Sequence, residues 1–173
     1  MKKLQKSFMV LVLAALMVSL NSCDPEEIDI NIDFIPSMEA TVGGEAWTST
    51  FRSVVVTESE TDPKIVIIGT PTANETADKT LILTIKGTEP GTYILGPDGD
   101  DYLFQCRMVY KKTADAVDGD INYYRGGVEK IVITKIDKEN KRISGTFEST
   151  GLYNIEEKTI KIENGTFKDL SYQ

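Results

Sequence analysis

Apolar and polar residues alternate in short runs along most of the chain beyond residue 36. The runs are rich in Val, Ile, Thr, Tyr and Phe, and a period of two is typical of β-strands with one buried face. No window shows a helical stripe of useful length, and the run 114–117 is too short. We expect strands at 38–42, 45–51, 51–57, 64–70, 80–86, 92–95, 102–110, 122–125, 128–136, 143–149, 159–163 and 166–172.

The segments between these runs have the composition of turns. Gly43 and Gly44 both accept a positive φ, so they predict a hairpin that places Trp47 opposite Ala40. Trp47 and Phe147 occupy period-two positions and are expected in the core, whereas Gly145 predicts a bulge or an aromatic ring packed over it. Further turns are expected at 59–63, 71–78, 89–91, 96–99, 137–141 and 164–165.

About ten short strands separated by regular turns predict a single all-β domain. We assign it to residues 37–173 and expect an antiparallel β-sandwich or a β-barrel-like fold. Strand composition and turn spacing do not distinguish these two architectures, because both are built from short antiparallel strands.

The first 22 residues have the composition of a targeting segment. Three lysines precede the apolar run Phe8–Leu20, which is 13 residues long and too short to span a bilayer. The run ends in Leu-Asn-Ser-Cys at 20–23, which resembles a lipobox, although Asn21 departs from the small or aliphatic residue usual there. We therefore expect residues 1–22 to be a cleaved lipoprotein signal peptide and Cys23 to carry the lipid, anchoring the protein stably to a membrane without spanning it.

Residues 23–36 are expected to form the lipidated cysteine and an acidic tether. Asp24, Glu26 and Glu27 follow the cysteine, a composition that resembles the surface-export signal of Bacteroidota lipoproteins. An aspartate beside the lipidated cysteine also resembles an inner-membrane retention signal, so the two interpretations conflict at this point. Alternation of isoleucines with polar residues from Ile28 allows an edge strand to begin within the tether.

The net charge limits the classes of molecule that the protein can bind, and the cysteine content limits how the fold can be stabilised. After cleavage the chain has 151 residues with 16 basic and 27 acidic side chains, a net charge of −11. Such a surface repels phosphate backbones and disfavours flat docking on an anionic lipid face. With Cys23 lipidated, Cys106 has no partner for an intramolecular disulfide, so the apolar core must supply the stability.

The sequence contains no recognisable catalytic, metal or cofactor motif. It has no histidine, which removes the common nucleophilic triads and histidine–zinc sites. Cys106, inside an apolar strand, is expected to be a buried and unreactive thiol. The acidic segments that begin at Asp98 and Asp118 offer calcium ligands but match no complete binding loop, so we interpret them as turns. Paired carboxylates of a small hydrolase remain an alternative that sequence does not test.

The segment Tyr123-Tyr124-Arg125 is the one candidate binding motif. Neighbouring residues of a strand point to opposite faces, so the core takes at most one tyrosine. An outward tyrosine beside Arg125 suits contact with a sugar or a peptide, whereas two half-buried sheet aromatics would have no binding role. The segment is followed by Gly126-Gly127, which places it next to a turn.

Two stretches together resemble a known family. The first is the sequence from Met38 to Trp47, with its Gly43-Gly44 pair. The second combines Ile143-Ser144-Gly145-Thr146-Phe147 with the segment 160–167 that contains Asn164-Gly165. These motifs resemble a family of Bacteroidota cell-envelope lipoproteins of unknown function, across residues 37–172. The resemblance implies an all-β fold and a cell-envelope location, and it implies no activity.

These observations favour a non-enzymatic lipoprotein, located at the outer membrane and exposed at the cell surface, that needs no cofactor. Its domain would bind a glycan, a peptide or another envelope protein, and would not bind nucleic acid. Two alternatives remain: a structural or accessory envelope subunit without a small-molecule ligand, and a small carboxylate-dependent hydrolase. An exposed aromatic platform would favour the first interpretation, a large flat apolar patch the second, and a cleft with two convergent acids the third.

Overall fold

The computed structural model describes residues 36–71, 78–95 and 105–173, and within them the chain forms one antiparallel sheet of eleven strands. This confirms the all-β prediction. The strands are β1 (Ser37–Val42), β2 (Glu45–Thr48), β3 (Phe51–Thr57), β4 (Lys64–Thr70), β5 (Thr80–Lys86), β6 (Gly91–Leu95), β7 (Cys106–Lys111), β8 (Tyr123–Arg125), β9 (Glu129–Asp137), β10 (Arg142–Tyr153) and β11 (Thr159–Ser171).

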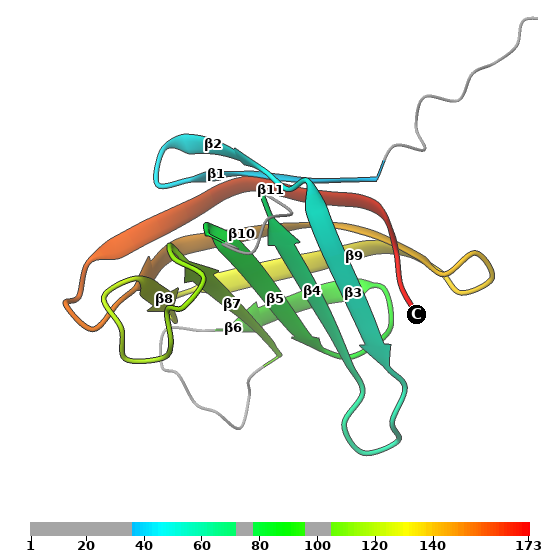
Figure 1. The fold of residues 1–173 in the computed structure, drawn as a ribbon. Helices are drawn as coiled ribbons and strands as arrows, with labels where there is room; N and C mark the ends of the chain where they lie inside the picture. Colours follow the sequence, from blue (N-terminus) through cyan, green and yellow to red (C-terminus); the bar gives the residue numbers. More distant parts are fainter. Residues whose placement is uncertain (1–35, 72–77, 96–104) are drawn as a thin grey trace, which may run out of the picture. The chain divides into compact units, whose positions relative to one another are not determined.

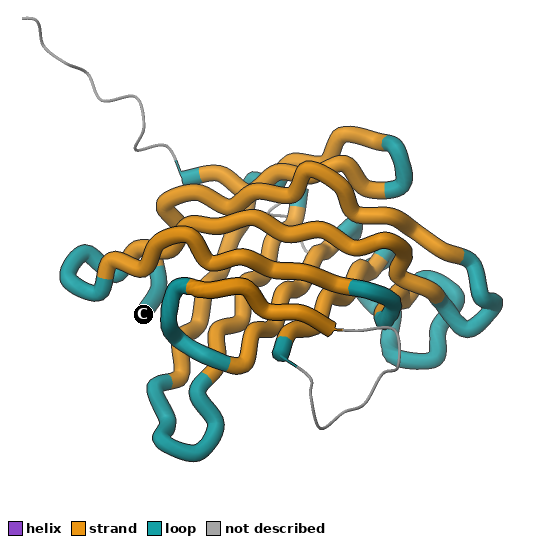
Figure 2. Tube along the Cα trace, turned by 180° about the vertical axis from the view of Figure 1, so that it is seen from behind, coloured by secondary structure: helices purple, strands orange, loops and turns teal. Residues whose placement is uncertain are grey.

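The sheet curls into a half-barrel. Its main path runs β2-β1-β11-β10-β8-β7-β5-β4-β3, and β9 pairs with β10 and with β6. The long strand β10 changes partner along its length, pairing with β9 over Arg142–Ser149 and with β8 at Tyr153. As a result, β3, β4, β5 and β7 cross over β9, β10 and β11 and enclose the core between them (Figure 1; Figure 2 shows the opposite side). Of the two predicted architectures, the chain therefore adopts the barrel-like one.

Two strand glycines allow β10 and β11 to bend. A Cβ atom at Gly145 would overlap the Val132 carbonyl oxygen and the ring of Phe167, and one at Gly165 would overlap the Phe147 carbonyl oxygen. The pairing register shifts beside both positions, which marks β-bulges. Gly145 thus combines the predicted bulge with the predicted aromatic contact. The predicted turn at Asn164-Gly165 is wrong, because Asn164 adopts a φ of 53° within β11 and the strand continues through it.

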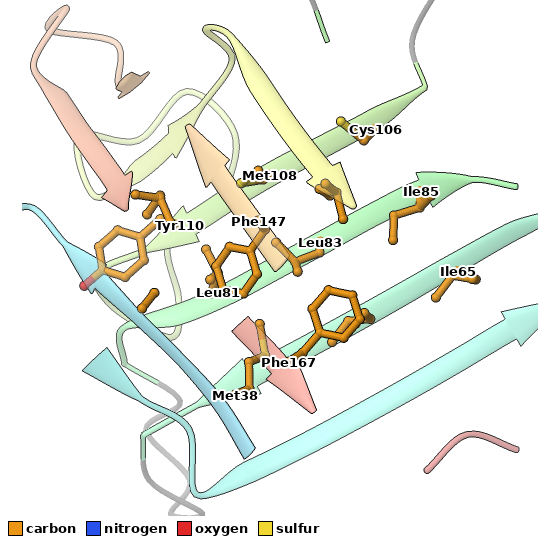
Figure 3. Close-up of a cluster of buried hydrophobic side chains, with 14 of the residues drawn as sticks. Met38, Ile65, Leu81, Leu83, Ile85, Cys106, Met108, Tyr110, Phe147 and Phe167 are labelled. Carbon is orange, nitrogen blue, oxygen red and sulfur yellow. The ribbon is translucent and has the colours of Figure 1, made fainter. Parts of the chain in front are cut away.

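The core lies inside the curl and consists of the inward-facing residues of both halves (Figure 3). Phe147 and Phe167 stack with ring centroids 6.4 Å apart and are surrounded by aliphatic side chains from β1, β4, β5 and β7. Trp47 is buried as predicted, and its indole N–H donates to the carbonyl oxygen of Lys79 at 2.7 Å. Buried positions alternate with more exposed ones along most of β1, β4 and β10, following the period of two that the sequence shows.

The predicted strands differ from the observed ones mainly at their ends. The hairpin register is correct, with Ala40 opposite Trp47, but β2 ends at Thr48. The strand predicted at 143–149 runs on to Tyr153, and the two predicted between 159 and 172 are the single strand β11. The lipobox, the tether with its possible strand from Ile28, and the Asp98 segment lie outside the described residues. Among the residues that are described, no helix has the length and hydropathy needed to cross a membrane.

Candidate functional site

Two loops meet at one end of the half-barrel. The first joins β7 to β8 over residues 112–122, and the second joins β10 to β11 over residues 154–158 (Figure 1). The buried side chain of Asn154 fixes both. Its Oδ1 accepts the backbone N–H groups of Glu156 and Lys158, each at 3.0 Å, and its Nδ2 donates to the carbonyl oxygen of Ile121 at 2.6 Å. The amide of one residue thereby satisfies backbone groups of two loops and holds them together.

A pocket of about 160 Å3 opens between these loops and the adjoining strand ends. Arg125 at the end of β8 forms an ion pair with Asp118 of the first loop, at 2.9 Å. Tyr153, half exposed, pairs with Arg125 across the β8–β10 ladder. The lining residues are Asp118, Gly119, Tyr123, Arg125, Tyr153, Asn154 and Ile155. We call this the Tyr123–Tyr153 pocket.

A glycine lies beneath the exposed ring of this pocket. Gly126 has a φ of 78°, and a Cβ there would lie 2.7 Å from Tyr153 Cε1. Glycine is therefore required at this position both by its backbone conformation and by the ring above it. The ring of Tyr153 packs against Gly126 on one side and is half exposed to solvent.

The three residues of the predicted binding motif separate as strand alternation requires. Tyr123 and Arg125 line the pocket, whereas Tyr124 points into the core, where its ring lies 6.3 Å from that of Tyr110. The ammonium group of Lys112 lies 5.5 Å from the Tyr124 ring centroid. Of the two tyrosines, Tyr124 is therefore the inward member and Tyr123 the outward one, and the candidate role in ligand contact falls to Tyr123.

Tyr153 and Asn154 also line the pocket, and neither is among the binding residues predicted from the sequence. The predicted strand ends at Ser149, just before Thr150-Gly151, where the apolar alternation is interrupted. The register shift between Ser149 and Leu152 shows a bulge that absorbs this interruption. The apolar alternation resumes at Leu152, and Asn154 is a residue typical of Asx turns. Together these two features indicate a strand that continues to Tyr153 and then turns.

Both acidic side chains of the segment Asp118-Gly119-Asp120 are engaged with neighbouring groups of the protein. Asp118 is engaged with Arg125, and Oδ1 of Asp120 accepts the backbone N–H of Asn122 at 2.8 Å. Within the described ranges, no group of three or more acidic or cysteine side chains is close enough to share a metal ion.

A second pair of ionisable groups is buried in the core. Glu129 and Cys106 are both inaccessible to solvent. Burial raises the pKa of the Glu129 carboxyl to about 8, although the backbone amides of Met108 and Gly126 and the charge of Arg107 oppose this shift. Burial, with the added effect of the nearby Glu129 charge, raises the pKa of the Cys106 thiol to about 12. At neutral pH the thiol is protonated and enclosed, as predicted for a structural cysteine.

A larger hollow, of about 300 Å3, lies on the outer face of β6, β9, β10 and β11, and Glu129 is among its lining residues. It is framed by the exposed side chains of Ile94 and Val128 and by charged residues of β9, β10 and β11. Lys130 and Glu148 form an ion pair there, at 3.0 Å. The charges in this hollow are therefore partly paired with each other.

Comparison with known proteins identifies a family but no activity. No curated protein and no solved structure matches the chain. The family described as "Domain of unknown function (DUF6252)" matches residues 35–171, which include every strand of the half-barrel. The chain therefore belongs to the DUF6252 family.

Proposed function

We propose that this protein is a non-enzymatic binding module of a surface-exposed lipoprotein, and that the Tyr123–Tyr153 pocket holds its ligand, a glycan, a peptide or an envelope protein. The observation that carries the proposal is the pairing of two pocket-lining tyrosines with a guanidinium group held by Asp118. Tyrosine and arginine are the side chains that most often dominate binding energy at interfaces.

The pocket is organised before a ligand arrives. Asn154 ties the two loops together, Gly126 supports the ring of Tyr153, and Asp118 holds Arg125 at the opening. Rigid aromatic side chains provide contact area at a low cost in conformational entropy. A ligand would therefore gain most of its contact energy without having to order the site.

The electrostatics of the pocket suit binding better than carboxylate catalysis. The acid that lines the pocket, Asp118, is neutralised by Arg125 at 2.9 Å. Acid–base hydrolysis of a glycoside requires two carboxyl groups facing each other across a cleft, one of them protonated. Glu129 has a suitable pKa and borders the 300 Å3 hollow, but its side chain is fully buried.

The proposed lipid anchor completes this function. A lipid on Cys23 followed by an acidic tether would present the domain at a membrane surface and leave its loop end free to meet a ligand. The support for this part comes from the signal-like segment 1–22 and the lipobox-like sequence at 20–23.

The test is a ligand screen followed by mutation of the two rings. The purified full chain is applied to a glycan array and to a displayed random-peptide library, and hits are titrated against Tyr123→Ala and Tyr153→Ala. Each variant should weaken binding by ~1–2 kcal/mol, because each removes one face of the pocket. Phe51→Ala is the matched control, since Phe51 is exposed to the same degree as Tyr153 but lies on β3. Absence of hits in both screens, or equal losses in the control, contradicts the proposal.

A further inference from the structure

Exposed apolar side chains gather around the Tyr123–Tyr153 pocket. The exposed fractions are 66% for Val117, 51% for Ile121, 50% for Tyr153 and 65% for Ile155. These four residues, which we call the loop-end patch, belong to the two loops that Asn154 ties together and to the adjoining end of β10. They make up half of the large apolar side chains that are exposed in the described part of the chain.

The aliphatic members of the patch distinguish between classes of ligand. Val117, Ile121 and Ile155 offer no hydrogen bond and no aromatic face, so they contribute little to contact with a sugar. A protein surface that brings its own apolar side chains would remove this area from water and gain about 25 cal/mol per Å2. An apolar centre that contains tyrosine and arginine is also the usual composition of a protein–protein contact.

The charged side chains around the patch carry a small acidic surplus. The two loops and the adjoining ends of β7 and β8 carry four bases, of which Lys111 donates to the carbonyl oxygen of Ala114, Arg125 pairs with Asp118, and Lys158 pairs with Glu156 at 2.6 Å. Lys112 lies against the Tyr124 ring. The acids of the same segments are Asp115, Asp118, Asp120, Glu156 and Glu157. The surplus is negative, and it includes the exposed acids Asp115 of the first loop and Glu157 of the second.

We propose that the loop-end patch is the docking surface for a protein partner whose contacting segment combines apolar side chains with flanking lysine or arginine. This inference rests on the proposed binding function and narrows its ligand to one class. The apolar side chains cover Val117, Ile121 and Ile155, and the basic ones face Asp115 and Glu157. Opposite charges on the two partners fix the orientation and accelerate association.

The inference is tested with a phage-displayed library of random twelve-residue peptides, selected against the purified full chain. We expect the enriched peptides to share an aliphatic or aromatic residue next to lysine or arginine. One enriched peptide is then synthesised and titrated against the wild type and the variants. Val117→Ser and Ile155→Ser should each weaken its binding at least fivefold, because each removes an apolar contact without disturbing the core.

Two matched controls separate docking from a general change of the surface. Val55→Ser removes an exposed aliphatic side chain, 51% accessible, from β3 and should leave the affinity unchanged. Glu157→Lys should weaken binding several-fold, whereas Glu139→Lys, in the β9–β10 turn at the other end of the domain (Figure 1), should not. Raising the salt concentration should weaken wild-type binding and leave the Glu157→Lys variant less affected.

Other outcomes overturn the inference in distinguishable ways. Peptides that are acidic, or that bind the Val117→Ser and Ile155→Ser variants as tightly as the wild type, contradict the docking surface. If no peptide is enriched but a glycan on the array requires Tyr123 and Tyr153, the binding function stands and the protein partner is wrong. If neither screen yields a ligand, both proposals fail.

Discussion

At the scale of single residues, Glu129 is the side chain whose environment departs most from its ordinary one. One carboxyl oxygen accepts the backbone N–H of Met108 at 2.5 Å, and the other has no hydrogen-bond partner among the described residues. A buried charged carboxylate is costly, and a pKa of about 8 means that the group is mainly protonated at neutral pH. The neighbouring Cys106 thiol donates to the carbonyl oxygen of Tyr93 and stays neutral over the same range.

The pH dependence of stability follows from this carboxyl group. Because the pKa of Glu129 is higher in the folded chain than in the unfolded chain, the folded state binds more protons between pH ~4.5 and ~8. The stability associated with the protonated group is therefore fully present below pH ~4.5 and is lost as the pH rises to about 8. A shift of this size corresponds to an upper bound of about 5 kcal/mol.

Glu129→Gln should remove this pH dependence. Glutamine keeps an acceptor for the Met108 amide and carries no charge at any pH, so it imitates the protonated glutamate. In urea unfolding at pH 5 and pH 8.5, the variant should gain stability relative to the wild type at the higher pH. Glu139→Gln, an exposed change in the β9–β10 turn, serves as the control. Equal pH profiles for wild type and Glu129→Gln would show that the carboxyl group titrates normally.

At the scale of elements, the two longest strands depend on glycines that face aromatic rings. Gly145 of β10 meets Phe167 of β11, and Gly165 of β11 meets Phe147 of β10. This reciprocal arrangement lets the two rings stack in the core beside the register shifts of the β10–β11 pair. Bulges with small residues are the usual means of curving a sheet without breaking it.

Gly165→Ala should therefore destabilise the half-barrel by about 2–3 kcal/mol, as is typical of overpacking. The added methyl group would overlap the Phe147 carbonyl oxygen, and backbone moves less readily than a flexible side chain. Gly91→Ala is the matched control, because it lies in β6 and its Cβ would have no neighbour closer than 3.8 Å. Urea denaturation measures both. Similar midpoints for the two variants would mean that the β10–β11 bulge relaxes easily.

At the scale of the whole molecule, the proposed anchor is a property of the chain upstream of the half-barrel. Cys23→Ser should abolish incorporation of a fatty-acid analogue during metabolic labelling and leave the signal segment uncut. The retained 22 residues would make the variant larger on a gel. Cys106→Ser is the control, because the buried second cysteine is not expected to be acylated. Equal labelling of the wild type and Cys23→Ser would exclude lipidation at this position.

The sequence by itself determined the features that depend on neighbours along the chain. Alternation with a period of two located the strands and separated Tyr123 from Tyr124, because successive side chains point to opposite faces of any sheet. Turn chemistry gave the β1–β2 hairpin with its register, since a Gly-Gly pair closes a hairpin of defined length. The burial of Trp47, Cys106 and Phe147 followed from the same alternation.

The tertiary structure decided everything that depends on pairing between distant segments. Alternation shows which face of a strand a side chain occupies, but it does not show which strand lies beside it. It also does not show whether a glycine forms a turn or a β-bulge. One curled sheet, the continuation of β11 through Asn164, and the encounter of Tyr153 with Arg125 all arise from such pairings. The burial of Glu129 has the same origin. A charged residue in a strand is normally expected at the surface, and only the packing of the surrounding strands shows that Glu129 is enclosed.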